Sequence, residues 1–413
     1  MIHFLQNIKG TRKYIYYAIL LFLFYEFMAR NFGLNRNFCF ILEFFSIILL
    51  FRHPYQIKAT RLEIPFKIMV SLFIVTIIGA LLNFIPPLNY IFGFRGQFLT
   101  IVFLFACASY LTIADYEKLF NLFYKFQYIN FFCTIYQFTV LGLTEDFNNG
   151  AFTAGLSQDI FCGALMTYYF YTYNQKKVKL YKLLFVIVSS LFIAVIQDER
   201  FIFLEICIIG VYFSLSAKLN LRKIILSIGM LSAIILGISN LSEDQSKTIN
   251  SINGIMEYSQ QTGGGYDLPR IGSSSVIQDL FFHNQIQELF GIGLGKGIET
   301  NLPFLDNSFY LHANLSYNWF SFQNVFLHTG WIGTILYIGF FISLMFYNLR
   351  CKKRAPKQYK YLYDISNIFT ILCISLIWYN AALRLHYGIF PYFILGLGPC
   401  VTKQILSKKI DIQ

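Results

Sequence analysis

The chain has 413 residues, of which 56% are hydrophobic and only 13% are charged. An ordinary soluble domain has about 25% charged residues, and the apolar residues here occur in long runs, so a soluble fold is excluded. The formal net charge of +12 would also suit a nucleic-acid-binding protein. The positions of the basic residues along the chain decide between that class and a membrane protein.

The apolar runs have the length of about 17 to 25 residues that crosses a hydrocarbon core as a helix, with every backbone group hydrogen-bonded. The sequence therefore predicts an all-α, polytopic transmembrane bundle of about twelve helices. We interpret the first apolar run as an anchor helix and not as a signal peptide, because no small-residue cleavage site follows it. The predicted spans are 14–32, 36–51, 66–83, 97–113, 121–142, 156–173, 183–197, 201–217, 224–241, 321–348, 363–382 and 388–405.

Most of the 33 lysines and arginines fall on one side of the membrane if the N-terminus is cytoplasmic, and they are densest at 350–360. Because cytoplasmic loops of membrane proteins carry an excess of Lys and Arg, this distribution explains the basic balance without nucleic acid. We therefore expect a multi-pass protein of the bacterial inner (cytoplasmic) membrane, with both termini cytoplasmic. The cluster at 350–360 is interpreted as a topology anchor beside anionic membrane lipids.

This topology divides the chain into three regions. They are the predicted helices one to nine in 1–241, a large extracytoplasmic (periplasmic) loop in 242–320, and the last three predicted helices with a cytoplasmic C-terminus in 321–413. The loop stands out because most other connections are short.

Within the loop, a helix is predicted from 275 to 289. It has Val276, Leu280 and either Ile286 or Leu289 near one face, as in a helix that lies on the bilayer or caps the bundle. Four glycines at alternate positions follow in 291–297, where they permit tight backbone turns.

Basic residues on the outer side run against the general bias and need individual explanations. Arg30 and Arg36 flank a tight turn, from which their side chains can reach the lipid interface. Another four lie where an outer loop meets a helix end: Arg95, Arg200, Arg270 and Arg384. Because a guanidinium forms bidentate, permanently charged hydrogen bonds with phosphate, these four could converge on one anion such as a lipid diphosphate. Each could instead pair locally, as Arg200 could with Asp198 or Glu199.

Histidines on the outer side are candidates for a general base, although an isolated histidine is more often structural. They are His283, His312, His328 and His386. Carboxylates within predicted spans are costly in lipid and must be paired or face a cavity; these are Glu26, Glu43, Asp159 and Glu205. Asp159 lies near the outer end of its predicted helix and could reach the same cavity as the arginines. Glu26 and Glu43 could be structural, paired with nearby arginines.

The sequence lacks the motifs of phosphate-cradling loops, dinucleotide-binding folds, zinc hydrolases and serine nucleophiles. The glycines of 291–297 match a dinucleotide loop only superficially, since no strand precedes them. The eight cysteines show no metal-ligand spacing and are interpreted as small core hydrophobes. We therefore expect no cofactor and no metal site.

Three stretches around the loop resemble the O-antigen polymerase and O-antigen ligase superfamily. They are 269–271 (PRI), 288–295 (ELFGIGLG) and 322–337 (FQNVFLHTGWIGTILY). The family pattern is an Arg, a Phe-Gly-Ile-Gly turn, and His-Asn before a helix that opens with Gly-x-x-Gly. Residues 197–200 (QDER) likewise resemble the family's Arg at the start of the helix after a short outer loop. One departure is Gln323 where ligases commonly have His, which leaves the general base unassigned: His312 or His328 could take its place, or the acceptor could be activated without a histidine. The departure also tilts the interpretation toward a polymerase.

The resemblance implies a metal-independent, inverting glycosyltransferase that uses an undecaprenyl-diphosphate-linked oligosaccharide at the outer face of the inner membrane. A hydroxyl of the next lipid-linked repeat unit would attack the anomeric carbon, so that O-antigen or capsule repeat units are polymerised. Arginines would stabilise the charge that grows on the leaving diphosphate. The residues implied for catalysis are Arg200, Arg270, His312 and His328, and those implied for binding the diphosphate and sugars are Arg95, Arg384, Gln323, Asn324 and Asp159.

The loop would cover the sugars, with aromatic residues that bind or stack on them: Tyr258, Tyr266, Tyr310, Tyr317 and Trp319. A chain-length regulator and a flippase are implied as partners. One alternative is an O-antigen ligase or O-oligosaccharyltransferase that uses the same donor. Another is a polysaccharide flippase or other twelve-helix transporter, although the long outer loop after the ninth predicted helix does not fit a transporter with two similar halves.

Overall fold

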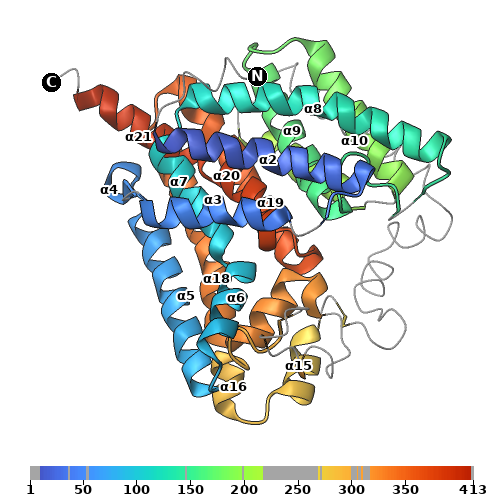
Figure 1. Cartoon of the computed structure of the whole chain (residues 1–413). Coiled ribbons are helices and arrows are strands. Elements are labelled where there is room, and N and C mark those ends of the chain that lie inside the picture. Colours follow the sequence, from blue (N-terminus) through green and yellow to red (C-terminus); the bar gives the residue numbers. More distant parts are fainter. Residues whose placement is uncertain are drawn as a thin grey trace.

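Figure 1 shows a computed structural model of the whole chain. The residues that it describes are 10–35, 38–52, 55–144, 147–197, 200–216, 268–269, 272–298, 305, 308–309 and 317–410. Within these ranges every regular element is a helix. An all-α protein is therefore confirmed for the described part of the chain.

The helices up to residue 216 are α2 (Thr11–Phe32), α3 (Cys39–Arg52), α4 (Ile57–Thr60), α5 (Glu63–Leu82), α6 (Pro87–Gln97), α7 (Val102–Tyr110), α8 (Ile113–Thr139), α9 (Gly155–Asn174), α10 (Leu180–Gln197) and α11 (Arg200–Ser216). Those that follow are α15 (Ser273–Phe281), α16 (Gln285–Phe290), α18 (Ser321–Arg354), α19 (Lys360–Tyr379), α20 (Ile389–Leu395) and α21 (Leu397–Ile410). Short 3-10 turns are η2 (Leu99–Ile101), η4 (Tyr317–Trp319), η5 (Lys357–Tyr359) and η6 (Leu385–Gly388).

Local sequence signals set several helix ends. Thr112 and Asp115 form a reciprocal capping box at the start of α8, in which each side chain accepts a hydrogen bond from the other's backbone N–H. Pro87 opens α6, where the missing N–H of a proline costs nothing. Gly33 ends α2 in the left-handed conformation. The end of α2 agrees with the predicted span 14–32, whereas α8 begins at Ile113 and not at 121, and α6 lies before the span predicted from 97.

Six segments of the described chain are helical, long and apolar enough to cross a membrane: Thr11–Phe32, Glu63–Leu82, Leu180–Gln197, Ser321–Arg354, Lys357–Tyr379 and Leu385–Ser407. A seventh is possible if α6 and the segment Leu99–Tyr110, which meet at 49°, form one broken span. The predicted span 224–241 and most of the predicted loop 242–320 lie outside the described residues. Twelve spans therefore stay a prediction.

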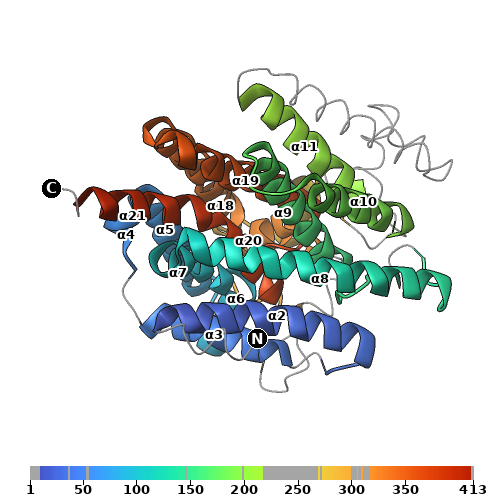
Figure 2. The ribbon, with the colours of Figure 1, turned by 90° about the horizontal axis from the view of Figure 1, so that it is seen from above.

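The C-terminal helices form the centre of the bundle. In the last two candidate spans, 78% of the apolar window is buried, against at most 44% in the other four. In Figures 1 and 2, α5 runs beside α18, and α2 and α8 lie across the other helices. α18 packs against α19 on one side and α5 on another. A change in α19 or α20 would therefore disturb the core more than one in α5.

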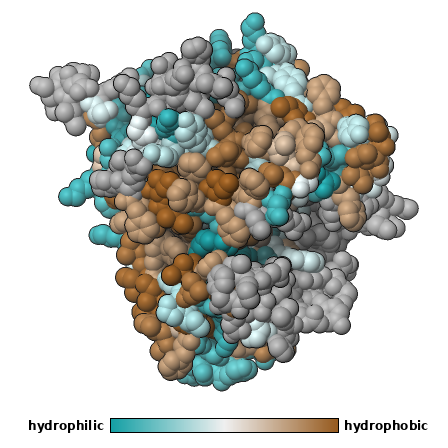
Figure 3. Space-filling view, viewed as in Figure 1, coloured by the Kyte–Doolittle hydropathy of each residue, from teal (hydrophilic) through white to brown (hydrophobic). Residues whose placement is uncertain are grey.

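The outer surface is largely apolar. Figure 3 shows hydrophobic side chains over much of one face, with hydrophilic residues gathered toward its upper and lower ends. Large exposed side chains include Phe24, Phe44 and Leu81. In water such a surface would aggregate, whereas in a bilayer it is the expected lipid-facing surface.

Two predicted elements differ from the structure. The helix predicted over 275–289 is two helices, α15 and α16, because Asn284 begins a new helix by accepting a hydrogen bond from the Gln287 N–H. Ile277 is the fully buried apolar residue of α15, while Leu280 is about half exposed. The span predicted over 97–113 is broken at Phe98, so that Arg95 lies within the last turn of α6 and not in a loop.

Candidate functional site

The glycine-rich segment 291–297 brings two distant parts of the bundle together. Gly291, Gly293 and Gly295 have φ angles of 74°, 91° and 107°, which lie in the left-handed region that side chains disfavour. A Cβ atom at Gly295 would lie 2.5 Å from the carbonyl oxygen of Asn89 in α6. The prediction of tight turns is therefore confirmed, and the reason for glycine is close backbone contact with α6 as well as conformation.

A kink in α18 turns its first part toward this segment. Gly330 has φ 60° and ψ −162° within the helix, and a Cβ atom there would lie 2.6 Å from the backbone nitrogen of Gly291. The freed carbonyl of Leu327 accepts a hydrogen bond of 2.9 Å from the Ile292 N–H. The kink and the glycine segment thus stabilise one another, and the stretch 321–329 faces α6.

A cavity of about 410 Å³ lies between these elements. Its walls are formed by α6, the glycine segment 291–297, η4 and the first part of α18. Residues 381–387, which include most of η6, complete them. The lining residues are Phe92, Gly93, Arg95, Gly96, Gln97, Leu156, Leu294, Gly297, Ile298, Asn318, Trp319, Asn324, His328, Ala381, Arg384, Leu385 and Tyr387. Four residues predicted for the site, Arg95, Arg384, Asn324 and His328, therefore line one cavity.

Arg95 is held by the buried Glu43 and by two aromatic rings, one of which, Phe92, itself lines the cavity. Its Nε lies 3.2 Å from Oε2 of the buried Glu43. Its guanidinium carbon lies 4.6 Å and 5.0 Å from the ring centroids of Phe40 and Phe92, at cation–π distance. This confirms the prediction that Glu43 pairs with an arginine, and the pair fixes where the charge of Arg95 lies.

Arg384 is more deeply buried, with 8% of its surface exposed. Its Nη1 donates a hydrogen bond of 3.0 Å to the backbone oxygen of Asn318. Leu385, the next residue, has a φ of 52°, which is rare for a bulky side chain and marks a backbone held under strain by its surroundings. That turn sends Arg384 and Tyr387 into the same cavity wall.

His328 lies in the cavity wall with a defined hydrogen-bond pattern. Its Nδ1 is 2.8 Å from the carbonyl oxygen of Asn324, and because a carbonyl can only accept, Nδ1 must carry the proton in the neutral ring. Nε2 then has the free lone pair. It lies close to Gly297, where a Cβ atom would approach it to 2.9 Å, so glycine leaves the space in front of this nitrogen.

The two amide residues at the start of α18 have different surroundings. Asn324 donates a hydrogen bond of 2.6 Å to the side-chain oxygen of Asn318 and lines the cavity. Gln323 points the other way: its Nε2 lies 3.1 Å from the carbonyl oxygen of Pro269 and 3.4 Å from that of Leu268. Gln323 thus holds the backbone next to Arg270 and does not line the cavity.

A second buried pair lies behind the cavity. His386 Nε2 is 3.4 Å from Oε1 of Glu26, and Oε2 of Glu26 accepts hydrogen bonds of 2.8 Å from both the N–H and the hydroxyl of Thr153. Glu26 therefore pairs with a histidine and not with an arginine as the sequence predicted. Neither Glu26 nor His386 lines the cavity, so we assign this pair a structural role.

Asp159 does not line the cavity. It is buried in α9, near the polar residues Gln158 and Gln197, whose amides are 2.9 Å apart. Glu205 of α11 packs against Gly163, one turn further along α9. Asp159 lies four residues before Gly163 on the same face of α9, and the described lining of the cavity does not include it, so the predicted approach of Asp159 to the arginines is not seen there.

Three of the residues predicted for catalysis cannot be placed. Arg270 and His312 lie outside the described residues, and Arg200 begins α11 with a side chain outside them. Arg36, Tyr258, Tyr266 and Tyr310 lie outside them as well. The convergence of four arginines is thus reduced, within the described chain, to Arg95 and Arg384.

Sequence reasoning missed Asn318, Tyr387 and Gly297 as parts of the site. Asn318 accepts from both Asn324 and Arg384, and Tyr387 follows the predicted His386. Of the predicted aromatic residues, Trp319 lines the cavity, while Tyr317 is buried and donates to the carbonyl oxygen of Gly297 at 3.1 Å. No local pattern distinguishes the two, because their roles depend on contacts with a distant segment.

The fold and the site together define an all-helical membrane protein with a basic cavity between the first part of α18 and α6. Two arginines and no carboxylate are among the described residues that line the cavity. No protein-family model matches the sequence, and no curated protein is significantly similar to it. The function has to be argued from the cavity itself.

Proposed function

We propose that the protein is an inner-membrane glycosyltransferase that polymerises repeat units of a surface polysaccharide from an undecaprenyl-diphosphate-linked donor. The observation that carries this proposal is the meeting of Arg95, Arg384, Asn324 and His328 in one cavity. These residues come from three segments that are far apart in the chain. They are also the ones that the resemblance to the polymerase and ligase superfamily, or the outer position of the arginines, singled out.

The electrostatics of the cavity suit an anionic leaving group. Glu43 lies behind Arg95 and outside the lining, and Arg384 is oriented through the Asn318 carbonyl. Positive charge fixed before the reaction stabilises negative charge that develops in the transition state, because no solvent has to reorganise. A diphosphate that leaves with the bonding electrons of the C1–O bond is the kind of group that such a site stabilises.

His328 is the general base in this proposal and activates the acceptor hydroxyl. Its Nε2 has a free lone pair when the ring is neutral, because Nδ1 donates to Asn324. An acceptor hydroxyl would transfer its proton to Nε2 while its oxygen bonds to the anomeric carbon and the carbon–diphosphate bond breaks. The attack from the face opposite the leaving group inverts the anomeric centre, and no metal is required for the balance of atoms and charge.

The remaining lining residues fit the recognition of sugars. Trp319 and Tyr387 offer aromatic faces and Asn318 and Asn324 offer amide groups. Sugars combine apolar ring faces with hydroxyls, so they are bound by aromatic and amide side chains together. A ligase would use the same donor and the same arginines, and it differs from a polymerase in its acceptor only.

Deletion of the gene in its host, with the surface glycan separated on a gel, tests the proposal. A product of a single repeat unit supports a polymerase. Long chains that stay on the carrier lipid would indicate a ligase, and an unchanged glycan would exclude both.

Purified protein in detergent micelles then separates an enzyme from a transporter. A micelle does not separate two compartments, so the action of a flippase, which moves its substrate without changing it chemically, yields no measurable product there. We expect elongation of a lipid-linked repeat unit by the purified protein, and repeated failure with intact, monodisperse protein would favour transport.

A further inference from the structure

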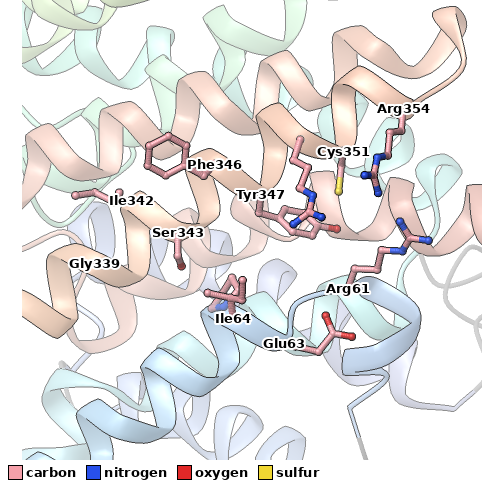
Figure 4. Close-up of a pocket in the computed structure, with 12 residues that line it drawn as sticks. Arg61, Glu63, Ile64, Gly339, Ile342, Ser343, Phe346, Tyr347, Cys351 and Arg354 are labelled. Atoms are coloured by element: carbon pink, nitrogen blue, oxygen red, sulfur yellow. The ribbon is translucent and has the colours of Figure 1, made fainter.

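A second and larger cleft, of about 740 Å³, opens between the start of α5 and the last turns of α18. Figure 4 shows its residues as sticks, with Arg61 and Arg354 directed toward one another across its basic end. Away from this basic end the cleft is lined by apolar residues of both helices. They are Ile64 and Pro65 of α5 and Ile342 and Phe346 of α18. The cleft therefore combines a cationic end with a hydrophobic groove.

Three arginines supply the charge: Arg61, Arg350 and Arg354. All three are exposed, and within the described part of the chain none of them forms an ion pair. Glu63 is the one carboxylate among the described residues that line the cleft. The cationic end thus keeps a positive excess that the protein does not neutralise.

The helix geometry directs these charges into the cleft and away from the rest of the basic cluster. Arg350 and Arg354 are four residues apart and lie on one face of α18, in line with Phe346 and Ile342. The neighbouring Lys352 faces elsewhere, with its Nζ 2.5 Å from Asp364 of α19. The cluster at 350–360 is therefore not a uniform patch.

The third arginine is fixed by the turn before α5. Arg61 has a φ of 56° and ends α4 in the left-handed conformation, which is uncommon for a residue other than glycine. The hydroxyl of Tyr347, in the floor of the cleft, donates a hydrogen bond of 2.6 Å to the carbonyl of the preceding Thr60. This contact fastens the turn to α18, so the Arg61 side chain stays beside the other two.

The cleft lies one membrane thickness from the candidate functional site. The part of α18 after its kink runs from Gly330 to Arg350, which corresponds to about 30 Å at about 1.5 Å per residue, and His328 lies just before the kink. The hydrocarbon core of a bilayer is about 30 Å thick. If His328 lies near one interface, the three arginines lie at the level of the opposite headgroups, and Ile342 and Phe346 lie at the level of the acyl chains.

We propose that this cleft is a specific binding site for an anionic phospholipid of the cytoplasmic leaflet. The phosphate would lie among Arg61, Arg350 and Arg354, with an acyl chain along Ile342 and Phe346. Charge complementarity selects an anion, and the continuous apolar wall selects a lipid over a soluble phosphate. The proposal does not depend on the glycosyltransferase activity, because its test measures binding only.

The test uses the full-length protein, purified in detergent, with lipid binding followed by native mass spectrometry and by the thermal midpoint. Phosphatidylglycerol should bind and raise the midpoint, and phosphatidylcholine should not. In Arg350→Gln/Arg354→Gln the affinity for phosphatidylglycerol should fall about tenfold or more. A wild-type protein that binds both lipids equally would overturn the proposal.

A matched control removes the same charge from the same segment. Lys353 and Lys357 are exposed and do not line the cleft, so Lys353→Gln/Lys357→Gln should keep the wild-type affinity. If both double variants lose affinity equally, the attraction is diffuse and the specific site is refuted. Each variant must elute as monodisperse protein with an unchanged midpoint in the absence of lipid.

The apolar wall is tested separately, with the arginines intact. Ile342→Ser/Phe346→Ser should weaken phosphatidylglycerol binding, since the chain loses its groove. Unchanged binding in this variant would contradict a lipid ligand. Inorganic phosphate is the second probe, and a midpoint rise with phosphate alone equal to that with the lipid would assign the cleft to a free anion and overturn the proposal.

Discussion

At the residue scale, one hydrogen bond decides what His328 can do. Nδ1 donates to the Asn324 carbonyl, which leaves Nε2 as the acceptor next to Gly297. His386 is a histidine of the same chain region, but its Nε2 lies against Glu26. The sequence presents both as candidate bases, and only their partners separate them.

His328→Asn should therefore reduce glycan elongation by about 10² or more, the usual contribution of a general base, without loss of protein from the membrane. Elongation of a lipid-linked repeat unit by purified protein measures this. The control is His283→Asn, since His283 is exposed and away from the cavity. Wild-type elongation rates in His328→Asn would exclude His328 as the base.

Gln323 has a positioning role in the structure. Its amide approaches the carbonyls of Leu268 and Pro269, directly before Arg270 in the chain. Gln323→Met keeps the volume and leaves both carbonyls without this donor, so we expect a loss of about 1 to 3 kcal/mol, seen as a lower thermal midpoint.

Gln175 is exposed between α9 and α10, and Gln175→Met serves as the control that should leave the midpoint unchanged. If Gln323→Met abolishes elongation while its midpoint stays at the wild-type value, Gln323 acts on the substrate and our assignment is wrong.

At the element scale, helices were predicted where apolar runs occur, and eleven of the twelve predicted spans overlap helices of the structure; the span 224–241 lies outside the described residues. The breaks within them were not predicted. α6 and α7 separate at Phe98, and α18 kinks at Gly330. Apolar runs indicate which residues are shielded from water. A bend depends instead on what the helix packs against, and both of these helices pack against the glycine segment 291–297.

Gly295→Ala tests this packing. The new Cβ would lie 2.5 Å from the Asn89 carbonyl, and the φ of 107° is unfavourable for alanine. We expect a destabilisation of more than about 1 kcal/mol, measured as a lower thermal midpoint in detergent.

Gly339→Ala in α18 is its matched control. A Cβ atom at Gly339 meets no atom within 4 Å, so this change should be neutral or slightly stabilising. An equal loss in both variants would mean that close backbone contact at Gly295 is not the cause.

At the scale of the whole molecule, the charge pattern predicts the orientation in the membrane. Reporter fusions can test it: a phosphatase is active outside the cytoplasm and a β-galactosidase inside. Fusions after residues 178 and 356 should show galactosidase activity only, and a fusion after residue 298 should show phosphatase activity only. Phosphatase activity after residue 356 would reverse the predicted topology and move the arginine cleft to the outer leaflet.

The sequence by itself determined the class of protein, the positions of most helices, and a short list of outer residues that needed an explanation. These follow from composition, run length and charge, which are local properties of the chain. The pairing of those residues was decided by the tertiary structure alone: Arg95 with Glu43, Arg384 with Asn318, and His386 with Glu26. Asp159 was left outside the cavity for the same reason. Which polar groups meet in a bundle depends on how its helices bend and pack, and that is set by contacts between segments distant in sequence.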